Sequence, residues 1–585
     1  MKKLNLAMAV AAGAILLSGC KLDKMIKLAQ ENNLQVNPNP LEVHGGEVPF
    51  EMSSELPPKI LPSNTSFTLN TIYVYGDQEI NVGAVEFTAA DFPNSSTSAS
   101  RKSENFSFAY QEGMNPGTLY VQGVAMDTRS GKSKTSERLA VAQGLIMTSA
   151  WVKDVAMASY ADHGYNDKEE LIPTNVDFYF DQGRSNLRTS LSYDGTSNRS
   201  KRDELSAFIA EKNVTRTVTI TGTHSPEGTE TVNSDLSEDR AKTIESFYRG
   251  RMSRYDYKGM ADSIDFILKP VIQDWSAFRT ALAAYDGIDA DAKQQYNNII
   301  NGTGSFVDKE KEMKKLSTYK KVFKDVYPGL RTAQTEVLTV KPKKSNAEIA
   351  ILAKAVVNGD AEADTLTMEE MMFSATLTPS LEEKAAIYKA AADASGMWQA
   401  HNNLAAVHIE LALAGDMAKL DGAATQLEIA MKKDENAMVM SNMGAVQLLQ
   451  GNYEEAYATL SDVSGGNEVN SKTAAMKGSL EVRMAKYDDA KASFASAQMN
   501  DNARIDRGLA YLLSGEYAVA EAEFNKVKTA DGYYLAAVAA ARQNNAGGVG
   551  TNLKKAVDEE PSYKDWALND LEFTNFADAV NNAVK

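Results

Sequence analysis

The sequence predicts three folded parts: an N-terminal β-sandwich, a central α/β sandwich and a C-terminal α-helical solenoid. Residues 46–150 alternate apolar and polar side chains in short runs between turn residues, the period of half-buried strands. Over 172–345 strand patterns alternate with helical patterns, which indicates layered strands and helices. Over 346–585 the chain is rich in alanine and in leucine at helical spacing, and it repeats itself.

Length and charge limit the function. A chain of 585 residues is too long for one hydrophobic core. With 43% apolar and 24% charged residues, its composition is that of ordinary globular domains. The net charge of −17 would repel nucleic-acid phosphates over most of the surface. We therefore expect no nucleic-acid partner.

The N-terminus has the pattern of an export signal. Lys2 and Lys3 precede an apolar run over residues 4–17. This run is shorter than the roughly 20 residues that a membrane-spanning helix needs, but it fits a secretory signal. The only cysteine of the chain, Cys20, follows directly after Ser18 and Gly19.

The sequence Leu17-Ser18-Gly19-Cys20 resembles a bacterial lipobox. This resemblance implies that residues 1–19 are a lipoprotein signal peptide and that Cys20 becomes acylated, with palmitate for example, and anchors the chain in the outer membrane. Residues 20–45, which are poor in apolar side chains, are then predicted to be a lipidated tether. No acidic run follows Cys20, which favours the periplasmic face.

Residues 46–150 are predicted to form an immunoglobulin-like sandwich in architecture only, serving as a spacer or docking surface. Four runs rich in aromatic and β-branched residues predict its strands, namely 67–75, 84–89, 106–110 and 118–126. The stretch 145–175 is transitional between this domain and the next.

The stretch 217–248 has the strongest local signal in the central part. An alternating strand containing Val218 and Ile220 leads into a loop and then into a helix that Asn233 or Ser234 can cap. Arg240 lies near the start of this helix, where it and free backbone N–H groups can bind an anionic group.

This stretch resembles the peptidoglycan-binding helix of OmpA-like domains, whose pattern is roughly T-D-x-x-G-x4-N-x-x-L-S-x-x-R-A. The matching residues are Gly228, Asn233, Leu236, Ser237, Arg240 and Ala241. The resemblance implies that 172–345 is an OmpA-like domain with an extended second half. In the family, the Asp and the Arg together grip the diaminopimelate of a peptidoglycan stem.

The resemblance departs from the family at the loop. His224 stands where the family has Asp, and one extra residue precedes Gly228, so that the loop reads H-S-P-E-G. Histidine cannot replace an anion that faces an ammonium, and Glu227 is the acidic residue nearest to that role. The candidate peptidoglycan-binding residues are therefore Arg240, Asn233, His224 and Glu227.

The C-terminal part contains internal repeats. Gly444 and Gly478 are 34 residues apart, and Gly508 follows after a further 30. The period and the small residues where paired helices meet resemble tetratricopeptide repeats. The resemblance implies a solenoid whose concave groove suits a peptide or a partner segment. The recurring Tyr453, Tyr487 and Tyr517 are interpreted as packing residues.

No pattern of residues indicates catalysis. The sequence lacks a P-loop, GxSxG, HExxH and CxxC. His401 and His408 share a helix face without a third ligand nearby in sequence, so they are interpreted as structural. We therefore expect a protein that is not an enzyme and that needs no cofactor or metal.

The favoured hypothesis is a lipid-anchored outer-membrane lipoprotein that acts as a periplasmic tether and scaffold. It would contact peptidoglycan through the OmpA-like domain and envelope proteins through the repeats. One alternative is a component of a cell-surface adhesin, a fimbria-like assembly or a type IX secretion and gliding machine. An enzyme acting on cell-wall glycan is disfavoured, because no pair of carboxylates stands out.

Overall fold

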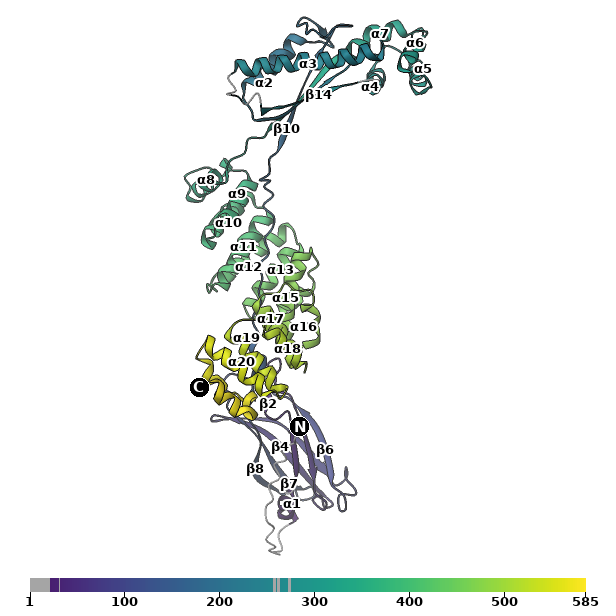
Figure 1. Ribbon diagram of the computed structural model, residues 1–585. Coiled ribbons are helices and arrows are strands. Elements are labelled where there is room, and N and C mark those ends of the chain that lie inside the picture. Colours follow the sequence, from purple (N-terminus) through teal and green to yellow (C-terminus); the bar gives the residue numbers. More distant parts are fainter. Residues whose placement is uncertain (1–20, 31, 256–258, 260–262, 272–274) are drawn as a thin grey trace. The chain divides into compact units, whose positions relative to one another are not determined.

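A computed structural model describes residues 21–30, 32–255, 259, 263–271 and 275–585. The chain divides into two compact units (Figure 1). The first unit combines the chain up to Tyr165 with Asn346–Lys585, and the second unit is Asn166–Ser345. The second unit is therefore inserted in sequence between the two halves of the first. Each unit is described by itself.

The N-terminal half of the first unit consists mainly of β-sheet, as predicted. A three-stranded antiparallel sheet has the order β1–β3–β6, with β1 at Asn33–Asn37, β3 at Phe50–Leu56 and β6 at Ser100–Phe106. A four-stranded antiparallel sheet has the order β5–β4–β7–β8, with bounds Gln78–Thr88, Thr65–Tyr75, Thr118–Asp127 and Ser133–Gln143. The short strands β2 (Leu41–Glu42) and β9 (Leu145–Ile146) pair in parallel. Alternate side chains from both larger sheets, Met52 and Phe67 among them, share one hydrophobic core.

The predicted tether over 20–45 is contradicted in the described residues from Lys21 onward. Residues Lys21–Ala29 form helix α1, whose Leu22 and Met25 are buried in the core of the sheets. Strand β1 then pairs with β3 along its whole length. The reason is that the apolar face of α1 covers core surface that the strands leave open. Cys20 and the signal peptide lie outside the described residues.

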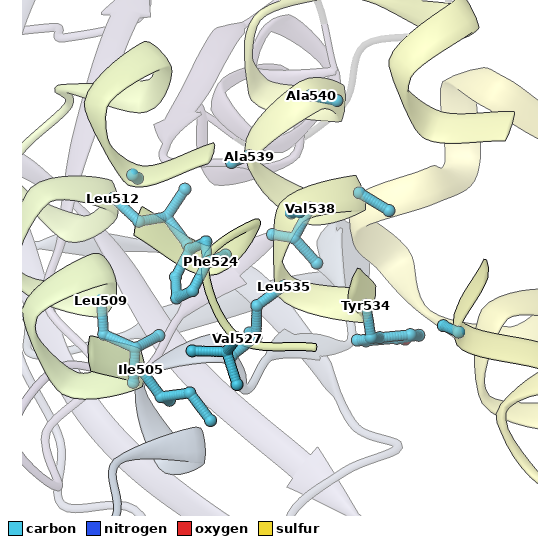
Figure 2. Close-up of a cluster of buried hydrophobic side chains, with 14 of the residues drawn as sticks. Ile505, Leu509, Leu512, Phe524, Val527, Tyr534, Leu535, Val538, Ala539 and Ala540 are labelled. Carbon is cyan, nitrogen blue, oxygen red and sulfur yellow. The ribbon is translucent and has the colours of Figure 1, made fainter. Parts of the chain in front are cut away.

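The C-terminal half of the first unit is an array of helical repeats, as predicted. Its helices are α8 (Asn346–Asn358), α9 (Met368–Ser374), α10 (Leu381–Ser395), α11 (Trp398–Leu413), α12 (Lys419–Lys433), α13 (Ala437–Leu449), α14 (Tyr453–Ser461), α15 (Asn467–Arg483), α16 (Tyr487–Phe494), α17 (Asp501–Leu513), α18 (Tyr517–Phe524), α19 (Ala530–Arg542), α20 (Ala546–Glu559), α21 (Tyr563–Asn569) and α22 (Ala577–Ala583). Short 3-10 turns at Ala363–Thr365, Ala375–Leu377 and Leu571–Phe576 join some of them. Figure 2 shows the apolar side chains that α17, α18 and α19 contribute to one continuous core.

The repeated glycines explain the close pairing of helices within a repeat. A Cβ atom on Gly478 would lie 2.9 Å from the ring of Phe494 in α16, and Gly508 meets Phe524 in α18 in the same way. Only a residue without a side chain fits there, because the second helix of these two repeats packs an aromatic ring against the backbone of the first.

The second unit is built on a four-stranded sheet with the order β10–β15–β13–β14. The bounds are Leu171–Tyr179, Thr332–Val340, Thr215–Gly222 and Asp265–Pro270. Strand β15 is antiparallel to both of its neighbours, whereas β13 and β14 are parallel. Helices α2 (Asn198–Ala210) and α3 (Glu230–Arg254) pack against the sheet through a shared core that includes Phe178, Ile220 and Ile244.

The extended second half of this unit forms a core of its own. The short hairpin β11–β12 (Ser192–Tyr193 and Thr196–Ser197) precedes α2. Helices α4 (Ser276–Ala284), α5 (Ala290–Asn301), α6 (Phe306–Met313) and α7 (Tyr319–Asp325), with the 3-10 turn Tyr327–Leu330, enclose a separate aromatic cluster.

Helix α3 begins earlier than the sequence suggested. Its N-cap is Thr229, whose side chain accepts a hydrogen bond from the N–H of Val232, so neither Asn233 nor Ser234 caps it.

Among the residues described by the structure, none of the helices has the length and apolar composition required to cross a bilayer.

Candidate functional site

The predicted site residues of the second unit gather at the loop between β13 and α3. Arg240 is the most deeply buried of them, with 1% of its surface exposed. Its guanidinium donates to three backbone carbonyls: Nε to Arg184 at 3.1 Å, Nη1 to Thr223 at 2.6 Å and Nη2 to Asp181 at 3.3 Å. The guanidinium carbon also lies 5.4 Å from the centre of the Phe180 ring. Arg240 therefore ties the loop after β10 to the end of β13.

Burial also affects the charge of Arg240. Removal from water and, to a smaller extent, the positive charge of Arg331 lower its pKa to about 10, while Glu227 opposes the shift. The group stays protonated at neutral pH. Its donors bond to the chain's own backbone, so its role in this geometry is to hold the loops in place.

Arg331 was missed by the sequence reasoning and is the ionic partner in this loop. Its Nη2 lies 2.8 Å from Oε1 of Glu227, and its Nε donates to Oγ of Ser225 at 2.9 Å. His224 Nδ1 lies 2.9 Å from the carbonyl oxygen of Ser225, and its ring meets Phe306 edge-on at 5.6 Å. The signal that could have found Arg331 was the acidic Glu227, which needs a cation when it is buried.

Two buried polar atoms at this site lack a hydrogen-bond partner in the described part of the chain. Asn233 is only 2% exposed, and its Nδ2 has no hydrogen-bond partner among the described residues. The same holds for Oε2 of Glu227 within the described part of the chain. A Cβ on Gly228, whose φ is +108°, would lie 2.9 Å from Asn233 Oδ1, so glycine is required for this close approach.

A second candidate site lies in the first unit, where the transitional stretch meets the helical array. After the 3-10 turn Thr148–Trp151, residues 152–161 form neither helix nor strand. We call residues 151–161 the connector segment. Most of it is nevertheless buried, since Val152 and Val155 join the core of the array and Ser159 is 2% exposed. The first helices of the repeats, α11, α13, α15, α17 and α19, contact it along its length, and we call their surface the first-helix face. At its ends it also meets Tyr388 of α10 and Tyr563 of α21.

Asparagine side chains hold the backbone of the connector segment. Asn442 Oδ1 accepts from the N–H of Ser159 at 2.8 Å, and its Nδ2 donates to the carbonyl of Ser159 at 2.8 Å. Asn403 does the same to Ala161, at 2.7 and 3.0 Å. Asn402 supports the first clamp, because its Nδ2 also donates to the carbonyl of Ser159, at 3.0 Å. Each clamp satisfies both polar groups of one buried residue.

A third clamp acts at Lys153. Asp506 Oδ1 accepts from the N–H of Lys153 at 2.7 Å, and the hydroxyl of Ser479 donates to the carbonyl of Lys153. The Lys153 ammonium lies 2.7 Å from Oδ2 of Asp531. Next to it, Asp154 pairs with Arg483 at 2.7 Å. Backbone and side chains of the segment are thus both held at this point.

The clamping residues Asn403, Asn442 and Asp506 occupy one position of the repeat, and the residues at that position in the other repeats also lie along the connector segment. Each lies two residues before the small residue of its first helix: Asn403 before Ala405, Asn442 before Gly444, Met476 before Gly478, Asp506 before Gly508 and Tyr534 before Ala536. Met476 shares a core cluster with Ala156, and the Tyr534 ring stacks on Trp151 at 5.3 Å between centres. The segment therefore passes along consecutive repeats in the direction opposite to their order in the sequence. The sequence contained this signal as Asn, Asn and Asp at one repeat position, but nothing in it indicated the partner.

Two of the residues interpreted as structural in the array make side-chain hydrogen bonds. His401 Nδ1 lies 2.7 Å from Oε1 of Gln426. Tyr487, one of the recurring tyrosines, hydrogen-bonds through its hydroxyl to Nδ1 of His44 at 2.7 Å and so contacts the β-sheet half of the same unit. The turn before this tyrosine also recurs, because the residue two positions before each recurring tyrosine has a positive φ, namely Gly451, Ala485 and Gly515.

Comparison with known proteins adds little. No family model matches the chain, and no curated protein matches it. Among solved structures, the chain is similar to the crystal structure of a tetratricopeptide repeat protein from Parabacteroides merdae. The similarity covers 40% of this chain and 93% of that one, at 17% sequence identity and a TM-score of 0.28. The assignment of helical repeats here rests on the helices themselves.

Proposed function

We propose that this chain is a non-catalytic lipoprotein of the outer membrane that faces the periplasm and acts as a tether and scaffold. Acylated Cys20 is its anchor, and the first-helix face of the array is its site for polypeptide in extended form. The partners are envelope proteins. The observation that supports this proposal most directly is the connector segment held along the array by backbone clamps.

The clamps bind backbone, which every polypeptide has. A paired hydrogen bond to the N–H and carbonyl of one residue reads an extended chain as a neighbouring β-strand would, with little regard to side chains. The side chains at the two asparagine clamps, Ser159 and Ala161, are small. Extended segments with small residues at these positions are therefore the expected ligands, and the chain's own connector segment is the first of them.

A proline variant tests whether the first-helix face binds peptide. Proline lacks the N–H that donates a hydrogen bond to Asn442 or Asn403. The double change Ser159→Pro with Ala161→Pro in the full chain should therefore weaken binding of the connector segment to the first-helix face. A fluorescent synthetic peptide of residues 149–165 should then bind this variant and not the wild type. A control that also carries Asn403→Leu and Asn442→Leu should bind no peptide. If the folded proline variant takes up no peptide, the proposed binding site is wrong.

The anchor is tested separately. Cells fed with a labelled fatty acid should label the wild-type chain and not Cys20→Ser, and only the wild type should sediment with outer membranes. Equal labelling of both proteins would refute the lipid anchor. Protease treatment of intact cells tests the orientation, because cleavage of the mature chain would favour the surface-adhesin alternative.

A second candidate function, which concerns the second unit, is contact with peptidoglycan. The buried Glu227 Oε2 and Asn233 Nδ2 favour it, since such atoms lack partners among the described residues and would gain them from the ammonium and carboxylate groups of a peptidoglycan stem. Glu227→Gln and Asn233→Leu should reduce sedimentation of the full chain with purified sacculi. Glu336→Gln, at an exposed position on β15, is the matched control. Unchanged sedimentation of both site variants would contradict this function.

A further inference from the structure

The clamp at Lys153 differs chemically from the two asparagine clamps. Asn403 and Asn442 each use a carbonyl acceptor and an amide donor, which together satisfy one residue of the segment. Asp506 stands at the same repeat position but, when ionised, offers acceptors only. It is fully buried, with 0% of its surface exposed. A buried carboxylate among hydrogen-bond acceptors is costly, so its protonation state matters here.

A count of protons shows what this clamp requires. The Ser479 hydroxyl has one hydrogen, and its Oγ lies within hydrogen-bond distance of both the Lys153 carbonyl and Asp506 Oδ2, the latter at 2.5 Å. If Ser479 donates to the Lys153 carbonyl, the contact with Asp506 needs a hydrogen on the carboxyl group. The neutral acid then completes a ring: Lys153 N–H to Asp506, Asp506 O–H to Ser479, and Ser479 O–H to the Lys153 carbonyl.

The surroundings of Asp506 agree with this count. Burial, with a smaller contribution from the neighbouring carboxylate of Asp154, raises its pKa to about 7, against the hydrogen bond from the Lys153 N–H, the contact with Ser479 and the positive charge of Arg483. The Lys153 ammonium does not offset the burial, because it pairs with Asp531 on α19.

We propose that Asp506 is a proton-controlled lock on the connector segment: as a neutral acid it completes the clamp at Lys153, and its ionisation loosens the segment from the first-helix face. The proposal rests on the proposed function, because it describes regulation of the same peptide-binding face. The clamps at Asn403 and Asn442 do not depend on pH, whereas the clamp at Lys153 is complete only while Asp506 is protonated.

The direction of the pH dependence follows from the two states of Asp506. A held segment keeps the pKa near 7, whereas a released one exposes the carboxyl group to water, where an aspartate has a pKa of about 3.9. The held state therefore binds the proton more tightly. The free energy that holds the connector segment on the first-helix face is greatest below the pKa of Asp506 in the released state. It decreases as the pH rises toward the pKa of Asp506 in the held state, and it is constant above that value. Between pH 5.5 and pH 8 the equilibrium constant for release should rise about 30-fold.

Hydrogen exchange of the full chain measures this change. In the wild type, protection of the backbone amides of residues 151–161, corrected for intrinsic exchange rates, should fall about 30-fold from pH 5.5 to pH 8. Asp506→Asn makes this clamp like its two neighbours and should abolish the fall. Asn442→Asp, the reverse change, should add a second pH-dependent loss. Protection of helix α13 in the same samples controls for changes in global stability.

The outcomes separate the lock from the proposed function. Wild-type protection that is independent of pH, or a fall that persists in Asp506→Asn, overturns the lock. The wild-type series decides this even if a variant fails to fold. Binding of the 149–165 peptide to the proline variant is measured at pH 5.5 and at pH 8. Binding at both values with equal affinity refutes the lock alone, whereas absence of binding at both refutes the peptide-binding face itself.

Discussion

Replacement of Asn442 by leucine tests the backbone clamp most directly. Leucine has the same number and branching of side-chain heavy atoms as asparagine but provides neither donor nor acceptor. The change removes the acceptor for the Ser159 N–H and one of two donors to the Ser159 carbonyl. It also removes the amide Nδ2 that donates a hydrogen bond to Asn402 Oδ1 at 2.9 Å. The Ser159 carbonyl keeps the Asn402 amide as a partner.

The expected loss follows from these contacts. The Ser159 N–H is buried and loses the acceptor that the structure gives it, and an unsatisfied buried polar group costs about 1–3 kcal/mol. The weakened Asn402 amide adds to this, so we expect a loss of about 2–4 kcal/mol in the free energy of holding the segment. Because about 1.4 kcal/mol corresponds to a factor of ten, protection of the 151–161 amides should fall by about 30-fold to 1000-fold.

Hydrogen exchange at a single pH is the assay, with Asn467→Leu as the control. Asn467 is the exposed first residue of α15, and its replacement should change stability by less than about 0.5 kcal/mol. Urea unfolding of the full chain is less suitable, because two separate units need not unfold in one transition. If Asn442→Leu leaves the protection of residues 151–161 within a factor of two of the control, the clamp does not hold the segment and the reasoning is refuted.

Three further changes test other parts of the structure. Ala485→Gly should raise the free energy of unfolding by about 0.5–1 kcal/mol, measured by thermal unfolding. The reason is that Ala485 has φ +56° at the turn where another repeat has Gly451. A loss of stability would show that the contacts of the alanine side chain outweigh the backbone strain. Gly508→Ala should lower stability by about 1–3 kcal/mol, since its Cβ would clash with Phe524, and an unchanged melting temperature would contradict the packing described for the pair. Arg240→Met should destabilise the second unit by about 3 kcal/mol or more and raise its protease sensitivity, because three carbonyls lose their donor, the buried one of Thr223 among them. Full stability with selective loss of sacculus binding would instead indicate a ligand-binding role.

The sequence predicted the elements that carry a strong local pattern. Strands β4 and β7 follow predicted runs closely, because one face of each is buried and the alternation is clear. Strand β8 was not predicted, since most of its side chains are exposed and it is held mainly by backbone pairing with β7. Helix α1 was missed because residues 21–45 are poor in apolar side chains overall, although Leu22 and Met25 share a buried face.

The candidate sites were predictable to different degrees. In the second unit, the pattern located the loop between β13 and α3 but placed the start of α3 too late, and the structure places His224, Glu227 and Asn233 in or beside that loop. It could not show that the guanidinium of Arg240 bonds to backbone carbonyls, nor that Arg331 pairs with Glu227, since those partners lie 56 and 104 residues away.

The sequence by itself determined the helical repeats, their small residues and the order of strands and helices in the central part, because these depend on spacing between near neighbours. Only the tertiary structure decided that the first-helix face is filled by the chain's own connector segment. Asn403 and Ala161 are 242 residues apart, Asn442 and Ser159 are 283 apart, and Asp506 and Lys153 are 353 apart. These contacts join side chains to backbone, which has the same chemistry at almost every position, so no pattern in the segment marks it as a ligand.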